Sequence, residues 1–180
     1  MDDSLTHWIN SAAGRSAWLD ATMISITSYG VPLMVVIVML QWWSRRDRSH
    51  VRHTCLAAGL SFCLGLGLNQ IILLFVHRVR PYDSGVSHLV IDRSADWSFP
   101  SDHATAAFAI AASFLLGGLQ RRGLAFLAAA ALVCHSRVYV GTHYFTDVGG
   151  GAVTGIFAAA LVRGLYWEGT RIDRLLTAVW

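Results

Sequence analysis

The chain of 180 residues contains no lysine, and all 14 of its basic side chains are arginine. Any contact with an anion must therefore come from guanidinium, imidazole or backbone N–H groups. Charged residues make up only 14% of the chain, against about 25% in an average soluble domain. The net charge is +3 and the arginines are not gathered into one run, so the composition does not favour nucleic acid as a partner.

Cysteine is also scarce. The three cysteines, Cys55, Cys63 and Cys134, all lie inside apolar stretches, and no C-x-x-C or Cys/His spacing accompanies them. This pattern favours packing over disulfide formation or metal binding.

What the chain has instead is apolar sequence: 54% of the residues are hydrophobic and the mean hydropathy is +0.48. Five apolar stretches are each near the roughly 20 residues that cross a bilayer, and backbone groups in lipid must be satisfied within a helix. We therefore expect one all-α, integral-membrane domain over residues 1–180, a bundle of about five transmembrane helices. The stretches cover about residues 23–43, 54–76, 103–119, 124–140 and 145–166.

The first 20 residues differ from the rest. Leu5, Trp8 and Ile9 are spaced to share one helix face, which predicts an amphipathic helix on the membrane surface within residues 3–19. A soluble tail is the alternative.

Charge predicts the orientation. With five spans, nine of the 14 arginines fall on one side, in linkers 44–53 and 120–123 and in the C-terminal region. The positive-inside rule makes that side cytoplasmic. The opposite side carries eight of the 11 acidic residues and a long connection, residues 78–100. A loop of this length is often functional, although its charges also fit a solvated surface.

Two histidines stand near helix ends on that outer side. His143 and Asp147 are four residues apart, so a helix beginning near His143 would place both on one face, where the carboxylate could orient the imidazole as a nucleophile. A structural pair is the alternative. Ser101 is a good N-cap for the third stretch, and His103 on its first turn could protonate a leaving oxygen. A plain helix cap is the alternative there.

Arginines flank the same side. Arg80 follows the second stretch and Arg137 lies near the end of the fourth. Guanidinium groups match phosphate oxygens bidentately, although an arginine at a helix end can also be an interfacial anchor. All these elements fall on one side of the membrane, the side that the linker charges alone predict to be extracytoplasmic.

Taken together, Arg80-Pro81, Pro100-Ser101-Asp102-His103, and Ser136-Arg137 with His143 and Asp147 resemble the three signature motifs of the type 2 phosphatidic acid phosphatase (PAP2) superfamily. The resemblance covers about residues 73–147. Two departures occur: Leu73 stands where the family has lysine, and Asp102 replaces a glycine. With these departures the chain resembles the bacterial branch of undecaprenyl-diphosphate phosphatases.

The resemblance implies a mechanism. Arg80, Ser101, Arg137 and the backbone near Asp102 bind the terminal phosphate, with Arg78 substituting for the missing lysine. His143 attacks phosphorus and forms a phosphohistidine, Asp147 orients His143, and His103 protonates the leaving lipid oxygen and then activates water. Neither a metal nor a cofactor is required, because arginines supply the positive charge.

We therefore predict a multi-pass lipid phosphatase of the inner or plasma membrane, with its site on the extracytoplasmic face and undecaprenyl diphosphate as the preferred substrate. Phosphatidylglycerophosphate or phosphatidate hydrolysis and lipid phosphotransfer are chemically close alternatives. A non-catalytic lipid binder or transporter is the alternative from another class. The expected partner is a lipid phosphate, and no obligate protein partner is evident.

Overall fold

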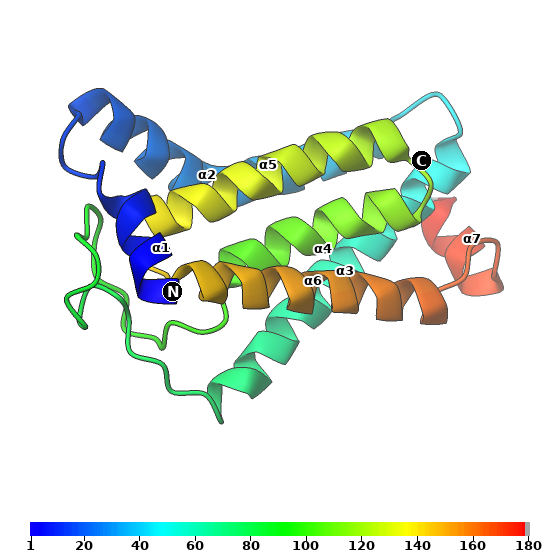
Figure 1. Ribbon diagram of the computed structural model, residues 1–180. Helices are drawn as coiled ribbons and strands as arrows, with labels where there is room; N and C mark the ends of the chain where they lie inside the picture. The colour runs from blue at the N-terminus through cyan, green and yellow to red at the C-terminus, as the bar shows by residue number, and fades with distance from the viewer. Residues whose placement is uncertain (179–180) are drawn as a thin grey trace.

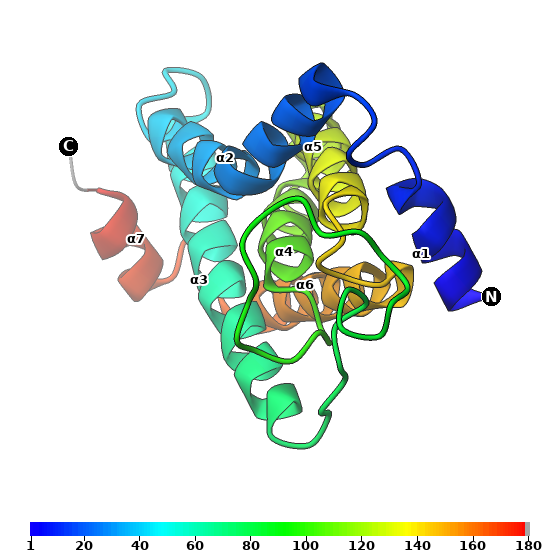
Figure 2. The ribbon, with the colours of Figure 1, turned by 90° about the vertical axis from the view of Figure 1, so that its left-hand side faces the viewer.

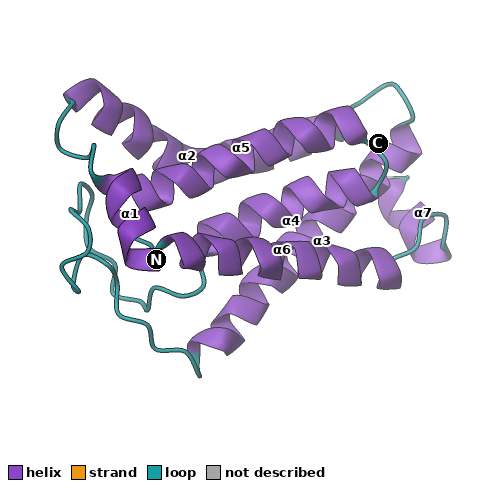
Figure 3. Cartoon of the chain, in the orientation of Figure 1, coloured by secondary structure: helices purple, strands orange, loops and turns teal. Residues whose placement is uncertain are grey.

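The computed structural model describes residues 1–178 and contains seven helices and no strand in that part of the chain (Figure 3). The all-helical prediction is confirmed, and each of the five apolar stretches coincides with a helix. The long helices are α2 (Ala17–Gln41), α3 (Arg48–Leu73), α4 (Asp102–Leu116), α5 (Gln120–Tyr139) and α6 (Phe145–Leu165).

Three of these helices, α2, α3 and α6, are long and apolar enough to cross a membrane. Helix α4 is apolar but has only 15 residues, about 22 Å at 1.5 Å per residue, which is shorter than the hydrocarbon core. Its short length is accommodated because α4 is the central helix of the bundle and contacts α3, α5 and α6. Most of its residues are buried against protein.

The helices alternate in direction, so the starts of α2, α4 and α6 and the ends of α3 and α5 meet at one end of the bundle (Figure 1). The connection over residues 74–101 contains no helix and lies across this end, in front of α4 and α6 (Figure 2). The connections over residues 42–47 and 117–119 join helices at the opposite end, next to the predicted arginine-rich segments 44–53 and 120–123, which lie mostly within the first turns of α3 and α5. The end under the long connection is therefore where the sequence motifs come together.

Close approach of α4 and α6 depends on two glycines. A Cβ on Gly151 would collide with the carbonyl oxygen of Ser101, and one on Gly155 with the carbonyl oxygen of Thr105. This pair of small residues, four positions apart, allows the two helix backbones to pack closely. The contact continues to the helix ends, where the Ser101 N–H donates to the carbonyl of Asp147 at 3.1 Å.

The N-terminal prediction is right in kind but wrong in extent. Helix α1 covers only Asp2–Asn10, and Trp18 and Leu19 already belong to α2. Leu5 and Trp8 are exposed, as expected for an apolar face toward lipid, while the buried side of α1 is polar. Thr6 and Asn10 are the residues on that buried side.

A seventh helix, α7 (Arg171–Thr177), was not predicted from the sequence. It contacts α3, where Asp173 accepts a hydrogen bond from His53 at 2.8 Å. The hydroxyl of Tyr166 and the N–H of Gly169 donate to the same carboxylate. This carboxylate cluster holds the C-terminal segment against the bundle.

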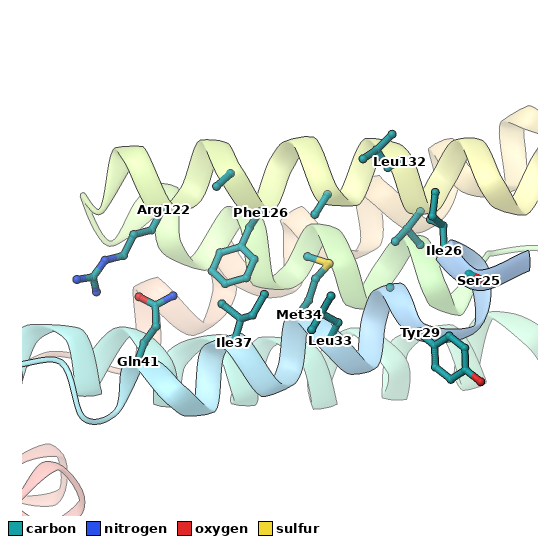
Figure 4. Close-up of a pocket in the computed structure, with 14 residues that line it drawn as sticks. Ser25, Ile26, Tyr29, Leu33, Met34, Ile37, Gln41, Arg122, Phe126 and Leu132 are labelled. Carbon is teal, nitrogen blue, oxygen red and sulfur yellow. The ribbon is translucent and has the colours of Figure 1, made fainter. Parts of the chain in front are cut away.

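The bundle surface carries an apolar groove of about 490 Å³ between α2 and α5 (Figure 4). Arg122 and Gln41 lie at one end of the groove and Tyr29 at the other, and aliphatic and aromatic side chains line it between them. The three cysteines are free thiols. The predicted packing holds for Cys55, which lies in the main core cluster with Phe114 and Phe126, whereas Cys134 is half-buried and Cys63 is exposed on the bundle surface.

Candidate active site

Residues from four separate segments form one buried polar cluster beneath the long connection. Arg80 comes from that connection, Ser101 from the start of α4, Arg137 from the end of α5, and His143 from the turn before α6. Each of these four side chains is less than 9% exposed. Side chains this polar are rarely buried without a functional or pairing reason.

His143 has a defined tautomer. Its Nδ1 lies 2.8 Å from the carbonyl oxygen of Ser98, and because a carbonyl can only accept, Nδ1 carries the proton. The lone pair is then on Nε2, which lies 3.5 Å from Nη1 of Arg80. Burial lowers the pKa of His143 to about 4; the carboxylate of Asp147 opposes this, and the guanidinium groups of Arg137 and Arg80 add to it. The imidazole is therefore neutral near pH 7, with Nε2 available for attack.

His143 and Asp147 do not both lie on one face of a helix, as their spacing in the sequence predicted. Helix α6 begins at Phe145, so His143 precedes the helix, and its Nδ1 lies 3.6 Å from Oδ2 of Asp147. Ser98 lies between the two residues: its carbonyl accepts from His143 and its hydroxyl donates to Asp147 Oδ2 at 2.5 Å. Asp147 acts on His143 through its charge and through Ser98.

Asp147 is completely buried and is surrounded by donors. Besides Ser98, the N–H of Tyr144 donates to Oδ2 at 2.9 Å and Nη1 of Arg78 donates to Oδ1 at 2.6 Å. An ionised carboxylate can be buried only with such compensation. The surrounding donors therefore satisfy both oxygens of this buried side chain.

Arg80 is held rigidly by the long connection. Its Nε donates to the carbonyl of Asp96 at 2.9 Å, and its Nη1 to the carbonyl of Thr142 at 2.9 Å. Nη2 donates to the hydroxyl of Ser94 at 3.1 Å. Neutral acceptors fix the guanidinium without cancelling its charge, so Arg80 presents a full positive charge beside His143.

Two other polar groups in the cluster have no partner. Nε of Arg137 and the hydroxyl of Ser101 are buried without a hydrogen bond, although Nη1 of Arg137 donates to Thr27 at 3.0 Å. An unsatisfied buried donor costs about 1–3 kcal/mol. A bound anion such as phosphate would satisfy both groups, and the start of α4 adds free N–H groups and a favourable dipole.

His103 lies on the first turn of α4, as predicted. The ionisable groups that interact electrostatically with His103 are Arg137, His143 and Arg80. The second predicted imidazole is thus within electrostatic range of the first, with arginines around both.

Asp102 turns its side chain toward α3. Its Oδ1 accepts from Nδ2 of Asn69 at 2.7 Å, and the same amide donates to Thr105 at 2.9 Å. Asn69 is fully buried and fixes the first turn of α4. This residue was not predicted from the sequence. The available signal was the amide pair Asn69-Gln70 in an apolar stretch, since a polar side chain in a membrane helix indicates a specific partner.

Arg78 makes contacts that its predicted role did not include. It bonds Asp147 and Asp2, both at 2.6 Å. Ser98 was also missed, although it stands only three residues before Ser101. Within residues 1–178, no three His, Cys, Asp or Glu side chains lie close enough together to share a metal ion.

A buried imidazole next to arginines and unpartnered donors, at one end of a membrane bundle, is an arrangement that could bind a phosphate group and transfer it. The chain belongs to the PAP2 superfamily, whose family model matches residues 54–171.

Relatives and a solved structure agree with this assignment. The chain is 33% identical to undecaprenyl-diphosphatase BcrC of Bacillus subtilis, over 85% of this chain and 78% of that protein. It is 31% identical to phosphatidylglycerophosphatase B of Bacillus subtilis, over 83% and 76%. The crystal structure of a transmembrane PAP2-type phosphatidylglycerolphosphate phosphatase from Bacillus subtilis superposes with a TM-score of 0.66 and 30% identity, covering 93% of this chain and 87% of that one.

Proposed function

We propose that this lipid phosphatase removes the terminal phosphate of undecaprenyl diphosphate through a phosphohistidine on His143. The observation that carries the mechanism is the direction of the His143 lone pair. Nδ1 is committed to the Ser98 carbonyl, so Nε2 faces the charge of Arg80 at 3.5 Å. A phosphate bound by Arg80 would therefore present phosphorus to the nucleophilic nitrogen.

The phosphate site consists of Arg80, Arg137, the Ser101 hydroxyl and the N–H groups at the start of α4 near Asp102 and His103. Burial strengthens these interactions, because donors fixed in a water-poor site need no reorganisation as charge develops. The unpartnered Nε of Arg137 and hydroxyl of Ser101 support this assignment.

The reaction has two steps. Nε2 of His143 forms a bond to phosphorus and the bond from phosphorus to the leaving oxygen breaks. His103, whose protonated form the negative charge of a bound phosphate favours, gives its proton to that oxygen. Water then attacks phosphorus with His103 accepting a proton, the N–P bond breaks, and inorganic phosphate leaves. Positioning and electrostatic stabilisation supply most of the catalysis in such transfers.

The substrate assignment is supported by the name of the undecaprenyl-diphosphatase relative at 33% identity. Phosphatidylglycerophosphate is the second candidate, because the phosphatidylglycerophosphatase relative is 31% identical and the superposed phosphatase acts on the corresponding lipid. Both are lipids with a terminal phosphate, and the site described here binds that shared group.

The site lies at the end of the bundle opposite the arginine-rich segments 44–53 and 120–123, which include the first turns of α3 and α5. The positive-inside rule supports a cytoplasmic location for those segments, and on this ground we propose that the phosphatase site faces the extracytoplasmic side of the inner or plasma membrane.

The test is phosphate release by the detergent-purified protein from undecaprenyl diphosphate, phosphatidylglycerophosphate and phosphatidate. We expect kcat/KM for undecaprenyl diphosphate to be at least about tenfold above the others, which is about 1.4 kcal/mol in the transition state. A tenfold preference for either glycerolipid would assign the second candidate or phosphatidate instead. Release from none of the three would contradict the proposed function.

A further inference from the structure

Arg78 joins two carboxylates that are far apart in the sequence. Its Nη1 donates to Oδ1 of Asp147 and its Nη2 to Oδ2 of Asp2, both at 2.6 Å. The guanidinium carbon lies 3.8 Å from the ring centroid of Tyr144. Stacking on one face and two charge-assisted hydrogen bonds fix the orientation of this group.

Asp2 connects this arrangement to the N-terminal helix. Its Oδ2 accepts from the hydroxyl of Thr146 at 2.5 Å, and its Oδ1 accepts from the N–H of Thr146 at 3.1 Å. In the next turn of α1, Thr6 accepts from the N–H of Phe145 at 3.0 Å. The first N–H groups of a helix lack partners within the helix, so α1 supplies acceptors to the start of α6.

We propose that Arg78 and Asp2 are positioning residues for the reaction at His143: Arg78 compensates the buried charge of Asp147, and Asp2 fixes Arg78 against the start of α6. The inference rests on the proposed function, in which His143 is the nucleophile. It gives the N-terminal helix a part in the chemistry. It also replaces the role predicted from the sequence, in which Arg78 contacts phosphate in place of the lysine missing at Leu73.

The physical reason lies in the balance of charge around His143. The positive groups that face the imidazole are Arg80 from the long connection and Arg137 from α5. His103 approaches it from α4. The facing negative group is Asp147 from α6. Without Arg78, the carboxylate of Asp147 would be uncompensated on one oxygen and would favour a protonated His143, which cannot attack phosphorus.

The test compares Arg78→Met, Arg78→Lys and Asp2→Asn with the wild type. The exposed pair Arg93–Asp83 is a matched control, since Arg93 also bonds an aspartate, at 2.9 Å, and lies over a tyrosine ring. Arg93→Met and Asp83→Asn should leave activity and its pH dependence unchanged.

We expect Arg78→Met to lower kcat by about tenfold to a hundredfold, because small displacements of reacting groups carry penalties of this size. KM should stay within about twofold, since the change affects the transition state more than substrate binding. The acid limb of the pH–rate profile should move to higher pH, and Arg78→Lys should return it toward the wild-type position. Asp2→Asn should lower kcat without raising the acid limb, because Arg78 keeps its charge beside Asp147.

The protonation of His143 can also be followed without activity, by NMR of the histidine-labelled protein in detergent micelles. The His143 signal is assigned by its absence in His143→Gln. A titration midpoint that is higher in Arg78→Met than in the wild type supports the inference. An unmoved midpoint, or a raised KM with an unmoved acid limb, overturns it. A wild type that releases no phosphate from any lipid tested contradicts the proposed function, and the NMR comparison still decides on Arg78.

Discussion

The Nδ1–H group of His143 donates a hydrogen bond to the main-chain carbonyl of Ser98 at 2.8 Å. A backbone acceptor cannot be removed by mutation of a side chain, so the tautomer of His143 is built into the path of the long connection. The Ser98 hydroxyl makes a second contact, to Asp147 at 2.5 Å. One residue therefore orients both members of the histidine–aspartate pair.

Ser98→Ala separates these two functions. The carbonyl of residue 98 stays in place while Asp147 loses one donor, so we expect kcat to fall by about tenfold with little change in KM. Phosphate release under saturating lipid measures this. Ser87→Ala is the matched control, because Ser87 lies in the same connection and its hydroxyl donates to the carbonyl of Gly141. Equal activities of the two variants would contradict the role of the Ser98 hydroxyl.

His143→Ala should abolish phosphate release, since no other nitrogen takes the place of Nε2. The variant should remain folded, because it loses only the hydrogen bond to the Ser98 carbonyl and the longer contact with Arg80. Thermal unfolding in detergent checks the fold, and rapid acid quenching of the wild type with radiolabelled substrate checks for an acid-labile phosphoenzyme. Activity near the wild-type level in His143→Ala would exclude it as the nucleophile.

The pH dependence follows from the low pKa of His143. A pKa of about 4 means that the reactive, neutral form predominates above that value, and protonation removes it as the pH falls. We expect kcat/KM to show no acid limb between pH 7 and about pH 5, and to decrease below about pH 4. An acid limb near pH 6.5 in kcat/KM would show that the environment of His143 does not favour its neutral form.

Chelators should leave the activity intact. Arg80 and Arg137 provide the positive charge at the proposed phosphate site, so the mechanism proposed here has no step that requires a metal ion. Phosphate release is measured before and after treatment with EDTA, followed by gel filtration. A loss of activity that added Mg²⁺ restores would refute this expectation.

Stability should depend on Asp173 at the other end of the molecule. Burial raises the pKa of this carboxyl, but hydrogen bonds from Tyr166, Gly169 and His53 outweigh it and lower the pKa below its ordinary value of 3.8. The resulting stabilisation is present above that value and is lost as the pH falls through the lower folded-state pKa.

Asp173→Ala should lower the free energy of unfolding by about 3 kcal/mol, as expected when one partner of a buried pair is removed. Glu168→Ala is the comparison, because Glu168 also pairs with a histidine, His50, but its side chain is 41% exposed; the change there should be under about 1 kcal/mol. Thermal unfolding at pH 7 measures both. Equal destabilisation by the two variants would argue against a special role for the Asp173 cluster.

The sequence determined the bundle and the segments that carry the site. Apolar runs of membrane-spanning length must become helices in lipid. The distribution of apolar residues along the chain therefore predicted where α2 to α6 lie. The alternation of five helices then placed the segments carrying Arg80, His103, Arg137 and His143 at one end.

The sequence could not supply the partners of those residues, because contacts across the fold depend on how loops and helix ends pack. The spacing of His143 and Asp147 suggested a direct bond along a helix, yet α6 starts two residues later and Ser98 lies between them. Arg78 was assigned to phosphate from a missing lysine, yet it lies between Asp147 and Asp2, which are 145 residues apart in the chain. Apolar runs in the sequence determined the helices. Only the tertiary structure decided which positively charged side chain lies against which buried carboxylate.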